Sequence, residues 1–205
     1  MIDLKDGMSI ARDTAVTLAA ISGGIVAWLG LQTWRRQLKG QTEYALAKRM
    51  LVSAYKIRGQ VRDVRNASID LGEMTHAMKE AGIAHEGLTM DDFTSKGTDA
   101  AYRARMRSLV GSWQELSADL LEGSAIWEDS PKAHFAALEQ CLRTLNVNMI
   151  LFLRRRPDNL PTPRVLKLEE VIYDQGTEDA PDEFGSKLNE AVRTIEVYLK
   201  PHLRR

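Results

Sequence analysis

A run of 21 residues without a charged side chain, Thr14–Trp34, constrains this chain more than any other feature. Charged residues bound the run directly, with Asp13 before it and Arg35 after it. At 1.5 Å per residue, a helix of this length spans roughly 30 Å, which is the thickness of a bilayer's hydrocarbon core. The run therefore predicts a single transmembrane helix over residues 14–34, preceded by a short N-terminal tail over residues 1–13.

The charges on either side of this run separate a membrane anchor from a cleaved signal peptide. Residues 1–13 carry three acidic and two basic side chains, whereas a signal peptide opens on a basic segment. Because positive charge stays on the inner side of a membrane, we expect the N-terminus outside and the rest of the chain in the cytoplasm. The alternatives are a buried helix of a domain without an anchor, and a signal peptide. The residues expected at the membrane interface are Trp28, Trp34, Arg35, Arg36 and Lys39.

Small residues recur at every fourth position of the predicted anchor. They form one smooth face, where a second helix can approach closely. This face predicts self-association into a homo-oligomer, although small residues are also common in membrane helices that stay alone. Its members are Ala15, Ala19, Gly23 and Ala27.

The neutral net charge of the chain combines two parts of opposite sign. The sequence has 28 basic and 28 acidic side chains, which argues against a nucleic-acid partner. Residues 35–65 contain nine basic and two acidic side chains, whereas acidic side chains predominate after them. Arg58, Arg62 and Arg65 lie too far along a straight helix to reach lipid headgroups. We therefore expect them to meet the acidic remainder of the chain or a partner.

Residues 35–66 are expected to form a basic amphipathic helix that continues the anchor. Gly40 permits a bend just below the membrane. The apolar side chains of this segment share one arc of the helix, so this face needs other helices to pack on. The arc comprises Leu46, Met50, Ile57, Val61 and Val64.

Residues 67–205 are expected to form a cytosolic antiparallel helical bundle that packs on residues 35–66. A short helix capped by Ser68 opens this part, residues 83–98 read as a loop, and residues 163–173 fit either a helix or a strand. Three apolar stripes with alternating spacings of three and four residues predict the long helices, and the fold class is all-α. The stripes are Tyr102, Met106, Leu109, Trp113, Leu116, Leu120 and Trp127; Phe135, Leu138, Leu142, Leu145, Met149 and Phe152; and Phe184, Leu188, Ala191, Ile195 and Tyr198.

The sequence contains no pattern that indicates a catalytic, cofactor or metal site. His85 has no second histidine four positions on, so a zinc-binding helix is not indicated. Cys141 lies among the leucines of a predicted helix, which indicates a small core residue rather than a nucleophile. We therefore expect a non-enzymatic interaction or scaffold module without a cofactor, which binds a protein partner or itself. The alternative is a membrane-associated enzyme or ligand sensor with a polar site around His134, Glu139 and Asn146.

The string Trp34-Arg35-Arg36-Gln37-Leu38-Lys39-Gly40, followed by Glu43 and Tyr44, marks the segment after the predicted anchor. Together with residues 122–127, it resembles a group of small uncharacterised bacterial proteins with one N-terminal membrane helix and a helical cytosolic part. The resemblance covers most of the chain. It implies a location in a bacterial inner membrane and carries no activity.

Overall fold

The computed structural model describes residues 4–84, 86–127, 129–154, 162–177 and 180–204, with side chains from residue 22 onward and, in the fourth segment, from residue 166. These residues form six helices and contain no strand, which confirms the all-α fold class. Residues 163–173 belong mainly to a helix, so the strand alternative is wrong. The helices are α1 Leu4–Arg65, α2 Leu71–Glu80, α3 Met90–Ile126, α4 Lys132–Arg154, α5 Thr162–Ile172 and α6 Glu183–Leu199.

The chain divides into two compact units, and the division falls within α1. The first unit takes in the described residues as far as Ala45, and the second is Leu46–Arg204. Within the described residues, no helix combines the length and the apolar character needed to cross a membrane. The side chains of residues 14–21, which begin the predicted transmembrane run, lie outside the described part.

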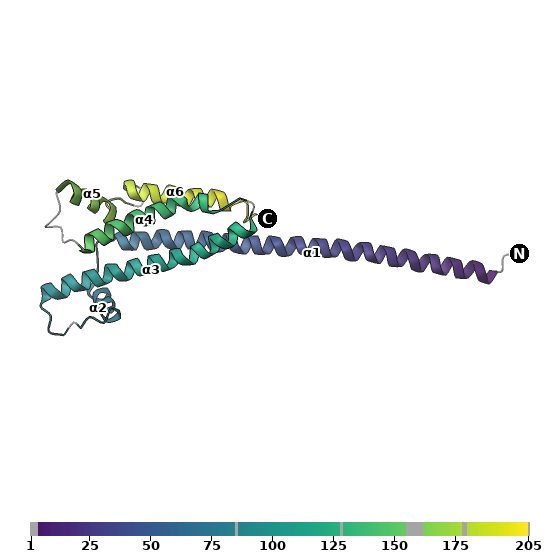
Figure 1. Ribbon diagram of the computed structural model, residues 1–205, viewed down its shortest axis with the longest axis horizontal. Coiled ribbons are helices and arrows are strands. Elements are labelled where there is room, and N and C mark those ends of the chain that lie inside the picture. Colours follow the sequence, from purple (N-terminus) through teal and green to yellow (C-terminus); the bar gives the residue numbers. More distant parts are fainter. Residues whose placement is uncertain (1–3, 85, 128, 155–161, 178–179, 205) are drawn as a thin grey trace. The chain divides into compact units, whose positions relative to one another are not determined.

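The second unit is a helical bundle built around the last five turns of α1. In Figure 1, α4, α5 and α6 lie on one side of this part of α1, and α2 and α3 lie on the other. The predicted apolar arc of α1 forms the centre of the core, because Leu46, Met50, Ile57, Val61 and Val64 are all 0% exposed. The three predicted stripes of α3, α4 and α6 pack around it.

The start of α2 differs from the prediction by two residues. Asp70, not Ser68, is the N-cap, and its carboxylate accepts a hydrogen bond from the backbone N–H of Glu73 at 2.8 Å. The helix ends before Gly82, whose φ of 68° is the left-handed conformation that closes helices. The backbone N–H of Ile83 then donates to the carbonyl of Met78 at 2.9 Å.

The predicted loop over residues 83–98 is wrong in its second half, because α3 begins at Met90. Thr89 is the N-cap, and its hydroxyl accepts a hydrogen bond from the backbone N–H of Asp92 at 3.2 Å. The first turns of α3 pack on α2 through small residues, so they lack the large apolar stripe that marks the rest of the helix. A Cβ at Gly97 would lie 2.9 Å from the Cβ of Met74, which shows how closely the two helices approach.

Candidate functional site

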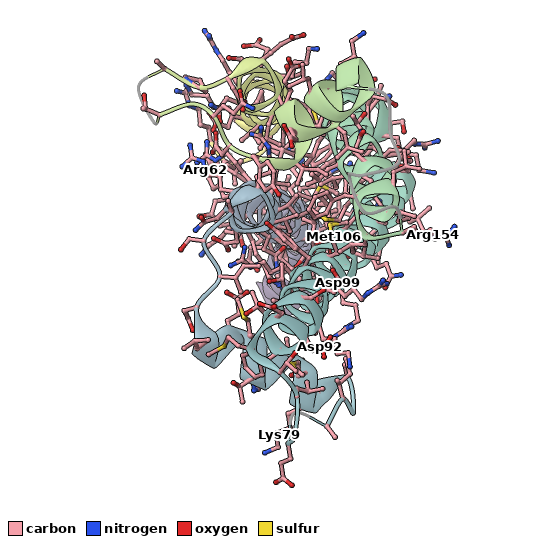
Figure 2. The ribbon with its side chains drawn as sticks, turned by 90° about the vertical axis from the view of Figure 1, so that its left-hand side faces the viewer. Arg62, Lys79, Asp92, Asp99, Met106 and Arg154 are labelled. Atoms are coloured by element: carbon pink, nitrogen blue, oxygen red, sulfur yellow. The ribbon has the colours of Figure 1, made fainter. Side chains whose placement is uncertain are left out.

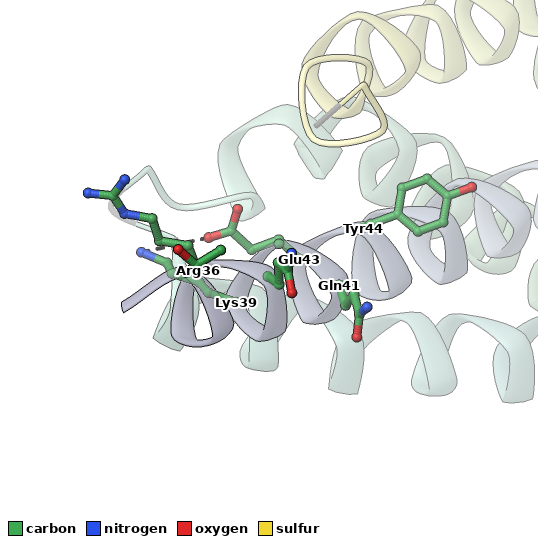
Figure 3. Close-up of a pocket in the computed structure, with 8 residues that line it drawn as sticks. Arg36, Lys39, Gln41, Glu43 and Tyr44 are labelled. Carbon is green, nitrogen blue, oxygen red and sulfur yellow. Dashed lines mark ion pairs between the residues drawn. The ribbon is translucent and has the colours of Figure 1, made fainter. Parts of the chain in front are cut away.

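The predicted membrane-interface residues lie on the first unit's part of α1 and are all exposed. Trp28 and Trp34 are 62% and 55% exposed, and Arg35, Arg36 and Lys39 are exposed too. Figure 3 shows the open hollow beside this segment, which eight residues between Thr33 and Tyr44 line. The ammonium of Lys39 lies 3.8 Å from the carboxylate of Glu43, one turn further along the helix. All eight lining residues come from one helix, so the hollow is a surface feature rather than an enclosed binding site.

The predicted helix-association face is described only in part. Ala15 and Ala19 belong to α1, but their side chains lie outside the described residues. Ala27 is exposed, and no neighbouring heavy atom lies within 4 Å of a Cβ built on Gly23. Self-association through this face stays a prediction.

The basic side of α1 pairs with acidic side chains of α3 inside the second unit. The guanidinium of Arg49 lies 3.1 Å from Asp119 and 2.6 Å from Glu122, and the ammonium of Lys56 lies 3.3 Å from Glu115. The hydrogen bond to Asp119 is the main reason why the pKa of Arg49 rises above its usual value. These pairs are largely exposed, so each contributes about 0–1 kcal/mol and helps to set the register of α3 on α1.

Arg65 is the most deeply buried charged residue among the described side chains of α1, ahead of Glu43. Its side chain is 2% exposed, and its Nη2 lies 2.5 Å from Oδ2 of Asp182. The same guanidinium donates to the backbone carbonyls of Glu170, Val171 and Tyr173 at 3.1, 2.8 and 2.8 Å. Arg65 therefore joins the end of α1 to the end of α5 and the start of α6, which confirms that it meets the acidic remainder of the chain.

Asp182 has two roles, as the counter-ion of Arg65 and as the N-cap of α6. Its carboxylate accepts hydrogen bonds from the backbone N–H groups of Gly185 at 2.7 Å and Gln175 at 3.2 Å. Burial alone would raise the pKa of Asp182, but the hydrogen bonds from Arg65, Gly185 and Gln175 together lower it. The carboxylate is therefore held in its charged form.

A second arginine, Arg105 of α3, binds the backbone at the C-terminal end of α1. It donates to the carbonyls of Asp63 and Asn66, both at 2.7 Å, and to the carbonyl of Ser68 at 3.0 Å. Its other contacts are with the carboxylate of Glu73, at 2.5 and 2.7 Å. The positive charge thus binds carbonyls at and just beyond the end of α1, and it complements the negative end of the helix dipole.

The structure does not bring His134, Glu139 and Asn146 together in one polar site. The ring of His134 stacks on that of Tyr198, with centroids 3.9 Å apart, and lines an open hollow on α6. Glu139 and Asn146 instead line a groove between α3 and α4. No group of three or more metal-binding side chains occurs among the residues that the structure describes.

An aromatic cluster that the sequence did not predict holds the end of α6 against the end of α3. Trp127 stacks on His202 with ring centroids 4.3 Å apart and meets the edge of Tyr198 at 6.1 Å. The hydroxyl of Tyr198 donates to the carbonyl of Asp129 at 3.1 Å. Trp127 was predicted only as the last member of an apolar stripe, because its partners come from the far end of the chain.

Cys141 lines a cavity of about 650 Å³ between α4, α5 and α6. It is half-buried rather than part of the sealed core. Burial raises the pKa of its thiol, and the nearby ammonium of Lys187 only partly opposes this rise. Lys187 is engaged by Glu183, whose carboxylate lies 2.6 Å away. Polar and apolar side chains thus line the cavity together. The raised pKa of Cys141 disfavours the thiolate, so the thiol is not poised as a nucleophile.

A groove between α3 and α4 is lined mainly by apolar side chains. It has a volume of about 240 Å³, and Met106, Leu109, Trp113 and Leu142 line it together with the more exposed Val110. Arg143, Glu139 and Asn146 form its polar edge. Comparison with protein-family models, curated proteins and solved structures finds no match for this chain.

Proposed function

We propose that the chain is a single-pass, membrane-anchored interaction module of a bacterial inner membrane. In this proposal Thr14–Trp34 lies in the bilayer, and residues 46–204 are presented in the cytoplasm, where they bind a protein partner. The proposal treats the protein as a binding module and not as an enzyme.

The uncharged run within α1 carries this proposal. All 21 residues of the run fall inside that helix. In the described part of the run, Val26, Trp28 and Leu29 expose 68%, 62% and 50% of their surfaces. Covering such a side chain completely is worth about 1.5–3 kcal/mol, and lipid is a medium that would cover all of them at once.

The charges that follow the run support the proposed orientation. Arg35, Arg36 and Lys39 are exposed directly after Trp34, which is where basic side chains meet the cytoplasmic leaflet. The next cations along α1 include Arg49 and Lys56, which are engaged in ion pairs within the bundle.

Membrane fractionation with alkaline carbonate tests the anchor. We expect the wild-type chain to stay in the membrane pellet and to need detergent for extraction. The double variant Val26→Arg and Leu29→Arg should shift to the supernatant, because each charge at the centre of a membrane helix costs about 2.5–3.5 kcal/mol. Val52→Arg is the matched control, since Val52 lies on the same helix, is 56% exposed and falls outside the run. Recovery of the wild-type chain in the carbonate supernatant would refute the anchor.

The binding role is supported by what the second unit leaves uncovered. Val110 of α3 and Val147 and Ile150 of α4 expose 41%, 51% and 40% of their surfaces. Two of the helices that carry the core thus also present apolar side chains to the outside, as partner-binding surfaces do.

A further inference from the structure

The α3–α4 groove combines a buried floor with an exposed rim. Met106 and Leu142 are each 8% exposed and Leu109 is 2% exposed, so the floor is already closed. Val110 stands at the rim on α3, and Ile150 continues the rim on α4, one turn beyond Asn146. A partner that covers this rim would bury apolar surface without any rearrangement of the core.

The charge beside this groove is mostly positive. Residues 100–114 and 139–154, which form its two walls, contain five arginines and one acidic side chain, Glu139, although the whole chain is neutral. Arg105 is used at the end of α1, and Arg107 lies 3.9 Å from Glu80. Arg103 and Arg154 are exposed and form no ion pair with any described residue, and Arg154 extends outward from the end of α4 in Figure 2.

We infer that the groove between α3 and α4 is a docking site for an acidic amphipathic helix of a partner protein. The inference rests on the proposed binding role of the second unit and is independent of the anchor. The apolar side chains of such a helix, spaced at three and four residues, cover Val110, Trp113 and Ile150. Its carboxylates then face Arg103, Arg143 and Arg154. This charge complementarity accelerates the association of the helix and fixes its orientation in the groove.

The apolar floor favours a protein helix over a nucleic acid. A phosphate backbone would satisfy the arginines, but it would leave the rim formed by Val110 and Ile150 uncovered. Arg143 also has an internal carboxylate at 2.8 Å, Glu139 at the edge of the groove. This pair shows, within the chain itself, the contact that a partner carboxylate would make.

Binding of two synthetic peptides to the full-length chain tests the inference. Both peptides carry leucines at the same helical positions, and their polar faces are all glutamate in one and all lysine in the other. Fluorescence anisotropy should show binding of the glutamate peptide and roughly tenfold weaker binding of the lysine peptide. If the chain needs lipid to stay in solution, phosphatidylcholine nanodiscs are used, and the signal from empty nanodiscs is subtracted.

Charge reversal on the groove supplies the decisive comparison. The double variant Arg103→Glu and Arg154→Glu should reverse the order of the two peptides, because both positions are exposed and their substitution leaves the core intact. Val110→Glu should weaken the binding of the glutamate peptide. Arg193→Glu is the matched control, because Arg193 is an exposed residue of α6 away from the groove. It should change the affinity of neither peptide.

Three results would overturn the inference. One is equal binding of both peptides to the wild-type chain, and another is a peptide order that the double charge reversal leaves unchanged. The third is a single-stranded or duplex oligonucleotide that binds the chain more tightly than the glutamate peptide and loses affinity with Arg103→Glu and Arg154→Glu. Circular dichroism of each variant shows that the helices are retained. None of these results bears on carbonate extraction, so failure of the docking site and failure of the anchor are distinguishable.

Discussion

Arg65 and Asp182, which are 117 residues apart in the chain, form a buried ion pair with Nη2 and Oδ2 separated by 2.5 Å. The pair connects the last residue of α1 to the N-cap of α6, and three backbone carbonyls complete the shell of the guanidinium. Arg65 also lies over the ring of Phe184, with Cζ 4.7 Å from the centroid. A charge in such a setting is tolerated only while its partners remain, so the pair holds the second unit in one arrangement.

The substitution Asp182→Asn tests this pair. Asparagine keeps an oxygen for the N-cap but leaves Arg65 buried without its counter-ion, so the free energy of unfolding should fall by about 3 kcal/mol. Asp174→Asn is the control, because that carboxylate lies 3.7 Å from Nη1 at an exposed position and should cost less than about 1 kcal/mol. Denaturant unfolding of the full-length chain measures both. Equal losses in the two variants would contradict the role given to Asp182.

The stability of the second unit should depend on pH through the same carboxylate. The pKa of Asp182 is lowered in the folded chain, so its stabilisation is fully present above the unfolded value of about 3.9. The stabilisation is lost as the pH falls through the folded pKa, because the unfolded chain binds the proton first. We expect the stability difference between the wild type and Asp182→Asn to shrink as the pH falls below about 4. A difference that stays constant with pH would show that the charge of Asp182 is not what stabilises the fold.

Two glycines of α3 should respond to alanine in opposite directions. At Gly97 the added Cβ would lie 2.9 Å from the Cβ of Met74, which cannot move away as the far end of a side chain can. Gly97→Ala should therefore destabilise the chain by about 1–3 kcal/mol through separation of α2 and α3. At Gly111 no neighbouring heavy atom lies within 4 Å of the added Cβ, so Gly111→Ala should stabilise by about 0.5–1 kcal/mol. Thermal unfolding of the two variants gives the signs, and equal signs would refute the close approach.

These two glycines also show which parts of the fold the sequence could predict. Large apolar residues with 3-4 spacing marked the second half of α3, and the same spacing marked α4 and α6, because burial of such residues is what fixes those helices. The first turns of α3 pack through Gly97, Ala100 and Ala101, and small residues carry no periodic signal of their own. Residues 83–98 are rich in Gly, Thr and Asp, so a loop was predicted where the chain forms a close helix pair from Met90 onward.

The functional surfaces were predictable to different degrees for the same reason. The uncharged run and its basic flank are local features, so membrane-interface residues could be named from the sequence alone, and they stay a prediction. The sequence alone does not distinguish the role of Arg105 from those of Arg103 and Arg107. That role depends on where the carbonyls of Asp63 and Asn66 lie in the fold. The α3–α4 groove also requires two helices to be placed side by side.

The contacts of Arg105 predict a local effect on the end of α1. In Arg105→Lys, a single ammonium cannot serve three carbonyls and a bidentate carboxylate together, so the last turn of α1 should fray. Hydrogen exchange should accelerate in the amides around Asp63 and Asn66 while those near Met50 stay protected. Arg107→Lys is the control, since that side chain is 57% exposed and makes one contact at 3.9 Å. Uniform acceleration throughout α1 would mean that the variant unfolds globally and that Arg105 does not act locally.

The orientation proposed for the chain predicts the effect of reversing its basic flank. Arg35, Arg36 and Lys39 are the first cations after the run, and the N-terminal residues 1–13 already have an acidic excess. Changing all three to glutamate removes the charge asymmetry that keeps the bundle in the cytoplasm, so part of the population should insert in the opposite direction or fail to insert. A reporter fused to the C-terminus and active only outside the cytoplasm measures this shift. Changing Lys132, Arg193 and Lys200 to glutamate controls for net charge and should leave the orientation unchanged, because these exposed residues lie far from the run along the chain. If both triple variants behave alike, net charge rather than the flank sets the orientation, and the proposed topology loses its support.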